Sequence, residues 1–129
     1  MRARALTAAS GMGERLAVLT SAGPMAGLWR GRHPVGVGDE LHFEMELENP
    51  RDWSEIGWRR VGGHSKVAPS SSPLWIEGTV TDFDQNGVLT LDVAGTPLMI
   101  DTTGEPPLGV VGLTVRVAAQ DLQFFPVEV

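Results

Sequence analysis

The stretch Glu40–Glu48, ELHFEMELE, alternates apolar and polar side chains without a break. Successive side chains of a strand point to opposite faces, so this period of two predicts a strand with one buried face and one wet face. A helix would instead repeat its apolar residues every three or four positions. The predicted buried set is Leu41, Phe43, Met45 and Leu47, and the predicted wet set is Glu40, His42, Glu44, Glu46 and Glu48.

The same period recurs in both directions from this stretch. In Val111–Ala119 the alternation predicts a second half-buried strand, with Val111, Leu113, Val115 and Val117 on its inner face. The C-terminal Leu122–Val129 is expected to be an edge or terminal strand, because Pro126 cannot donate to a ladder. Other predicted strands are Leu16–Thr20, Leu28–Arg32, Trp75–Phe83, Leu89–Val93 and the segment containing Leu98 and Ile100.

Together these strands predict an all-β fold, a small antiparallel barrel or barrel-like sandwich of the OB or SH3-like kind. The segment after Trp75 is expected to form a meander. Asn49-Pro50 suits a helix start, so at most one short helix is expected near residues 50–57. We expect a single domain over residues 1–129, with a polar loop at 62–73 separating two halves. The sequence leaves open whether residues 1–24 pack as a strand or hang free, and residues 1–14 are the candidate mobile segment.

The composition is that of an ordinary globular protein, with 42% hydrophobic and 20% charged residues. The formal net charge of -6 disfavours nucleic acid as a partner and favours a basic one. There is no cysteine, which excludes thiol nucleophiles and thiolate metal sites. No apolar run is long enough for a signal peptide or a membrane span, so we expect a soluble, cytoplasmic protein without a membrane partner.

The stretch Thr81–Val93, TDFDQNGVLTLDV, begins like a calcium-binding loop. The twelfth position counted from Asp82 is Val93, however, where such a loop requires a bidentate Glu. Asn86-Gly87 between two alternating segments is also a strong hairpin signal. We interpret this stretch as a hairpin turn, with a weak calcium site as the alternative.

The wet face of the opening stretch carries the first candidate site, formed by His42, Glu44 and Glu46. A solvated strand face is the simplest interpretation of such a row. The alternatives are an acidic partner-binding stripe and a divalent metal site completed by His33 or His64.

A second candidate site is WSEIGWRR, Trp53–Arg60, which combines Trp53 and Trp58 with Arg59 and Arg60. Tryptophan beside arginine can anchor a protein partner or stack nucleobases. A role for the tryptophans in the core is the competing interpretation.

No motif supplies a nucleophile or a metal together with an oriented partner, so we expect neither an enzyme nor a cofactor. The favoured hypothesis is protein–protein association through both candidate sites, in an immunity-type or inhibitor role, as an assembly subunit, or by self-association. The alternative is an OB-like module that binds single-stranded nucleic acid or a small ligand through tryptophan and arginine. A metal-dependent enzyme using His33, His42, Glu44 and His64 is the third hypothesis.

Overall fold

The computed structural model describes residues 1–60 and 74–127, and its regular elements are strands apart from one short 3₁₀ turn. The all-β prediction is therefore confirmed. The strands are β1 Arg2–Ala5, β2 Arg15–Thr20, β3 Gly23–Trp29, β4 Glu40–Leu47, β5 Arg51–Asp52, β6 Gly57–Arg59, β7 Trp75–Phe83, β8 Val88–Val93, β9 Thr96–Thr103, β10 Thr114–Ala118 and β11 Leu122–Pro126, and the turn η1 is Trp53–Glu55.

The first sheet is a closed barrel in the order β1-β2-β3-β11-β4, which confirms the prediction of a barrel. Its strands pair antiparallel except β11, which runs parallel to β3. The expectation of an edge strand at the C-terminus is wrong, because β11 lies between β3 and β4. Pro126 is tolerated there because it occupies the last position of β11, opposite Phe43, where the ladder ends.

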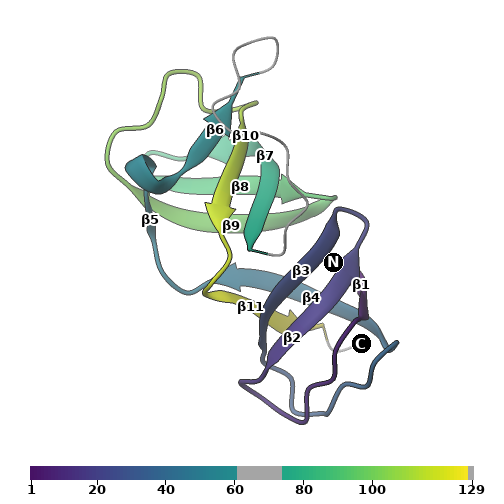
Figure 1. The fold of residues 1–129 in the computed structure, drawn as a ribbon. Helices are drawn as coiled ribbons and strands as arrows, with labels where there is room; N and C mark the ends of the chain where they lie inside the picture. Colours follow the sequence, from purple (N-terminus) through teal and green to yellow (C-terminus); the bar gives the residue numbers. More distant parts are fainter. Residues whose placement is uncertain (61–73, 128–129) are drawn as a thin grey trace.

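The second sheet has six strands in the order β5-β9-β8-β7-β10-β6 and lies beside the barrel (Figure 1). The hairpins β7–β8 and β8–β9 follow the predicted meander, but β10 pairs with β7 and not with β9. The long connection after β9 allows this return, and β5 already pairs with the end of β9. The predicted loop at 62–73 lies outside the described residues.

The two sheets do not divide the chain into a first and a second half, because β5, β6 and β11 each join the other part. β5 and β6 precede residue 61 in the chain yet join the second sheet, while β11 follows that sheet in sequence and returns to the barrel. The chain therefore crosses between the sheets twice, once after β4 and once before β11. N-terminal residues are ordered in this arrangement, because β1 pairs with both β2 and β4.

Alternation sets the inner faces as predicted. In β4, Phe43 and Met45 are buried while His42, Glu44 and Glu46 are exposed. Phe43 packs on Phe124 of β11 with ring centroids 4.4 Å apart. The inner residues of both sheets form one continuous hydrophobic core.

One residue of the predicted inner faces is misplaced. Val111 is 60% exposed, although Leu113, Val115 and Val117 are buried as expected. The strand starts only at Thr114, and Gly112 has a φ of +95° that turns the chain immediately after Val111. A period-two pattern cannot extend through a left-handed residue, so the prediction fails at this one position.

The local turns follow their residue types. Asp84 accepts hydrogen bonds from the backbone nitrogens of Asn86 (2.8 Å) and Val88 (2.9 Å), and Gly87 has a φ of +81°. The hairpin interpretation of this stretch is thus confirmed, although Gly87 and not Asn86 takes the positive φ.

The predicted helix near 50–57 is only η1, and its cap is Asp52 rather than Asn49. The Asp52 carboxylate accepts from the backbone nitrogen of Ser54 at 3.0 Å. Arg51 and Asp52 are held in β5 by pairing with β9, so the chain cannot begin a helix at Asn49-Pro50.

Candidate functional site

The acidic row of β4, defined as Glu40, His42, Glu44 and Glu46, is exposed on the outside of the barrel. Its first half lies beside basic residues, because β1 places Arg4 opposite Glu40 and Arg2 opposite His42. Its second half has uncharged cross-strand neighbours on β11, with Phe125 opposite Glu44 and Gln123 opposite Glu46. The negative charge of the row is therefore concentrated at Glu44 and Glu46.

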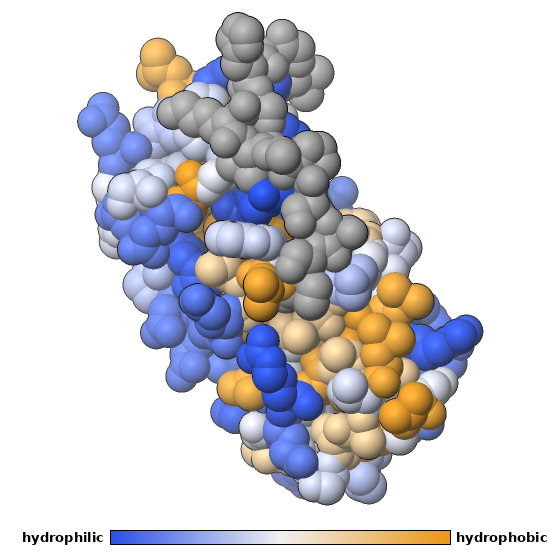
Figure 2. All heavy atoms as spheres, viewed as in Figure 1, coloured by the Kyte–Doolittle hydropathy of each residue, from blue (hydrophilic) through white to orange (hydrophobic). Residues whose placement is uncertain are grey.

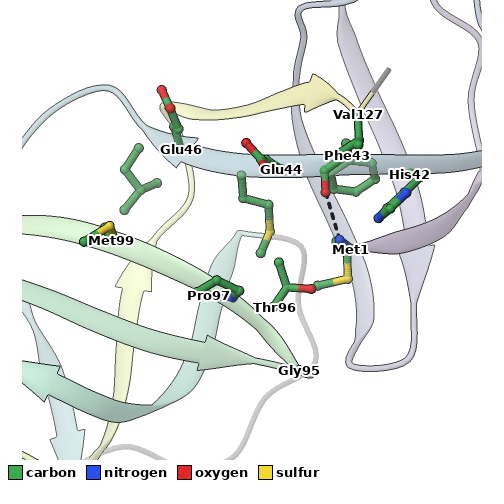
Figure 3. Close-up of a pocket in the computed structure, with 12 residues that line it drawn as sticks. Met1, His42, Phe43, Glu44, Glu46, Gly95, Thr96, Pro97, Met99 and Val127 are labelled. Carbon is green, nitrogen blue, oxygen red and sulfur yellow. Dashed lines mark hydrogen bonds between the residues drawn. The ribbon is translucent and has the colours of Figure 1, made fainter. Parts of the chain in front are cut away.

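These two carboxylates border a groove at the junction of the two sheets, the β4–β9 groove (Figure 3). The groove has a volume of about 640 Å³, within the range of ligand-binding pockets. Its second wall comes from β9, where Thr96, Pro97 and Met99 lie across from β4. Met99 is 65% exposed, so this wall offers apolar surface to a ligand.

Met1 lines one end of the groove, and its backbone nitrogen donates a hydrogen bond to the carbonyl of Phe43 at 2.9 Å. Burial lowers the pKa of the Met1 amino group, whereas the carboxylate of Glu44 acts in the opposite direction. Glu44 is thus close enough to attract a positive charge at this end of the groove. Within residues 1–60 and 74–127, neither Glu44 nor Glu46 takes part in an ion pair.

The tryptophan–arginine segment lies in the second sheet, and its tryptophans differ in role. Trp53 is 6% exposed and packs edge-on against Phe83, with ring centroids 6.0 Å apart. Trp53 is therefore a core residue. Trp58 is half-buried, and the guanidinium of Arg60 lies 5.5 Å from its ring centroid.

The arginines of this segment are engaged within the protein. Arg59 forms an ion pair with Glu77, which also binds Arg116 at 3.2 Å. Arg60 donates to the carbonyl of Leu108 at 2.8 Å. A binding site for a phosphate backbone needs arginines that are available to the phosphates. Here Arg59 binds Glu77 of β7, and Arg60 binds the connection after β9.

The structure does not bring the two candidate sites together into one surface. The β4–β9 groove contains no residue of Trp53–Arg60. Trp53 and Trp58 instead line a separate hollow of about 440 Å³ with the loop residues Glu105, Pro106 and Pro107. Any partner that uses both sites would have to reach from the barrel to the far part of the second sheet (Figure 1).

The described residues give no support to the metal hypotheses. In the described part of the chain, no three His, Asp or Glu side chains are grouped to hold an ion. Asp84 accepts hydrogen bonds from the backbone of its own turn, and the exposed Asp82 lies in β7 opposite Thr90. His64 lies outside the described residues.

Sequence reasoning missed the β9 wall of the groove. The alternation that buries Leu98 and Ile100 places Met99 on the outer face of β9 beside Pro97. An apolar side chain at a position that should be wet is a signal of a binding surface. Its location opposite Glu44 and Glu46 depends on the packing of the two sheets and has no signal in the sequence.

Comparisons with protein-family models, with curated proteins and with solved structures found no match for this chain. Over the described residues, no helix has the length and apolar character that crossing a bilayer requires.

Proposed function

We propose that this chain is a non-catalytic β-barrel module that binds a basic protein partner in the β4–β9 groove. The observation that carries the proposal is the position of Glu44 and Glu46 at the rim of a groove whose opposite wall contains the exposed Met99. Protein interfaces combine an apolar centre with a polar rim, and this groove offers both. An inhibitor or immunity-type role toward a cationic protein, or a subunit role in an assembly, would use the same contact.

Electrostatics supports a basic partner over an acidic one. The chain has a net charge of -6, and the second half of the acidic row has no basic cross-strand neighbour. Such a rim steers a positively charged partner and accelerates its association, an effect that weakens as salt screens the charges. The buried apolar contact with Met99 would then slow dissociation.

The test is a selection of short random peptides displayed on phage against the immobilised protein. We expect enriched peptides to combine arginine or lysine with a large apolar residue. In the double variant Glu44→Gln/Glu46→Gln, the Kd of these peptides should rise about tenfold or more. Met99→Ser should increase the dissociation rate while leaving the salt dependence of association intact.

The matched control removes two exposed carboxylates far from the groove, at Glu55 and Asp82, as Glu55→Gln/Asp82→Asn. This variant has the same net charge as the test variant and should keep the affinity within about twofold. Equal losses in both double variants would reduce the effect to overall charge and contradict a specific groove. An enriched set without basic residues would contradict the proposed partner.

A further inference from the structure

The outer face of the β2–β3 hairpin breaks the alternation that the rest of the barrel obeys. The inner residues of this hairpin, Leu16, Val18 and Met25, are buried as the pattern requires. Its outward positions should be polar, yet beyond Arg15 those of β2 are Ala17 and Leu19, and those of β3 are Pro24, Ala26 and Leu28. We call this surface the hairpin face and define it by Leu6, Ala17, Leu19, Pro24, Ala26 and Leu28.

The residues of the hairpin face are neighbours across the strands. Leu19 lies opposite Pro24, and Ala17 lies opposite Ala26. Leu6 continues the row, because its backbone nitrogen donates to the carbonyl of Ala17 at 2.8 Å. Figure 2 shows hydrophobic residues gathered over this part of the barrel. The apolar positions therefore form one contiguous patch and not scattered single residues.

The exposure of this patch is substantial, since Leu6 is 43% and Leu19 is 46% exposed. By contrast, the outer face of β4 carries only Glu and His at its exposed positions. A contiguous exposed apolar patch rimmed by charge is the usual mark of a docking surface. The equivalent outward positions of β4 are polar, so a strand of this barrel does not need apolar side chains on its outer face.

The rim of the hairpin face is basic. Arg4 lies opposite Leu19 across β1–β2, and Arg15 lies opposite Leu28 across β2–β3. Both arginines are exposed. Arg4 also lies opposite Glu40 across β1–β4, but in the described part of the chain neither arginine takes part in an ion pair. An occupant that covers the hairpin face from Leu19 to Leu28 therefore meets Arg4 beside Leu19 and Arg15 beside Leu28.

We propose that the hairpin face docks an apolar segment of a partner protein that carries acidic residues on either side of its apolar centre. This partner chemistry is opposite to that of the β4–β9 groove, so the inference stands independently of the proposed function. A second copy of the chain would present the same arginines to this face, whereas an acidic segment neutralises them. A lipid surface fits less well, because the patch has no Trp or Phe to insert at the interface.

The test uses ¹⁵N-labelled protein titrated with a panel of short synthetic peptides containing leucine and glutamate. A second panel has lysine in place of every glutamate. We expect the amide shifts caused by the glutamate panel to cluster at β2 and β3. The Kd fitted from these shifts should be about tenfold higher for the lysine panel. Leu19→Lys should abolish the shifts, Leu19→Ser should weaken them, and Arg15→Glu should reduce the preference for glutamate. The dispersion of the amide spectrum reports whether each variant is folded.

The control variant is Leu108→Lys, which changes a side chain that is 90% exposed in the connection after β9. It adds the same charge and should leave the shifts at β2 and β3 unaltered. Equal shifts from both peptide panels, or none from either, would overturn the inference. Two other results would also overturn it. One is a dimer, seen by analytical ultracentrifugation, that becomes monomeric in Leu19→Lys. The other is binding to phosphatidylglycerol-containing vesicles that Leu19→Lys abolishes.

Discussion

The buried Arg51 and the half-buried Asp121 form an ion pair that joins the two crossings of the chain between the sheets. Arg51 also donates to the carbonyls of Asn49 (2.7 Å) and Ala118 (2.9 Å). Asp121 in turn accepts from the backbone nitrogen of Asn49 at 2.7 Å. Because the crossings after β4 and before β11 hold the barrel beside the second sheet, this pair also sets the geometry of the β4–β9 groove.

Removing one partner of this pair should destabilise the protein strongly. Asp121→Leu leaves the buried Arg51 without its counterion, and we expect a loss of about 3 kcal/mol in the free energy of unfolding. Arg51→Met leaves the half-buried Asp121 unpaired and should cost less, because water still reaches that carboxylate. The double variant Arg51→Met/Asp121→Leu should lose less than the sum of the two single changes. Urea denaturation measures all three, and additive losses would show that the two residues act independently.

The same pair predicts how stability depends on pH. Burial alone would raise the pKa of Asp121, but the hydrogen bonds from Arg51 and from the Asn49 backbone lower it below its ordinary value. A depressed folded-state pKa means that the contribution is complete above the unfolded pKa of about 3.9 and is lost as the pH falls through the folded value.

The stability difference between the wild type and Asp121→Asn should therefore be constant above about pH 5 and shrink below about pH 4. Urea denaturation of both proteins across this range measures it. A difference that grows on acidification would contradict the assignment.

Gly27 allows β3 and β11 to approach each other closely. A Cβ at this position would lie 2.8 Å from the carbonyl oxygen of Leu122 and 3.0 Å from the ring of Phe124. Since one contact is with backbone, Gly27→Ala should cost about 1–3 kcal/mol of unfolding free energy. Gly11→Ala is the control, because a Cβ there meets nothing within 4 Å, and thermal unfolding should show it to be nearly neutral. Equal melting temperatures for the two variants would refute the close-packing argument.

Single-stranded oligonucleotides should leave the tryptophan fluorescence unchanged, even at low ionic strength. Trp53 is buried, Arg59 is held by Glu77, and Arg60 is held by the Leu108 carbonyl. A stacking platform requires exposed aromatic faces beside available cations. A saturable quench that Trp58→Phe removes would revive the nucleic-acid hypothesis.

Several strands could be predicted because each is encoded locally. By contrast, β1, β5 and β6 were not predicted, and the strand expected at Leu28–Arg32 is instead β3, Gly23–Trp29. Glu40–Leu47 and Trp75–Phe83 carry their period of two in their own residues, and the Asp84–Gly87 turn follows from side chains that bind their own backbone. The failures at Val111 and at Asn49-Pro50 differ in origin, because the first is local and the second comes from a distant strand. At Val111 a glycine turn interrupts the period, and at Asn49-Pro50 pairing with β9 prevents a helix.

The candidate site was predicted only in part, since its two halves come from segments far apart in sequence. Glu44 and Glu46 were recognised as an acidic row, but Met99 gained significance only where β9 lies across from β4. The tryptophan–arginine segment was grouped with the acidic row for its composition. The structure separates them, because β6 pairs with β10 in the other sheet.

By itself, the sequence determined that this chain is built from strands, which side chains of its alternating strands are buried, and that its net charge is negative. Those properties depend on neighbours one or two residues apart. Only the tertiary structure decided that β11 returns to close the barrel, that β4 and β9 enclose a groove, and that Arg4 and Arg15 flank an apolar face. Strand order and register are set by how the buried faces pack against one another, and a period of two is the same for every order in which such strands could pair.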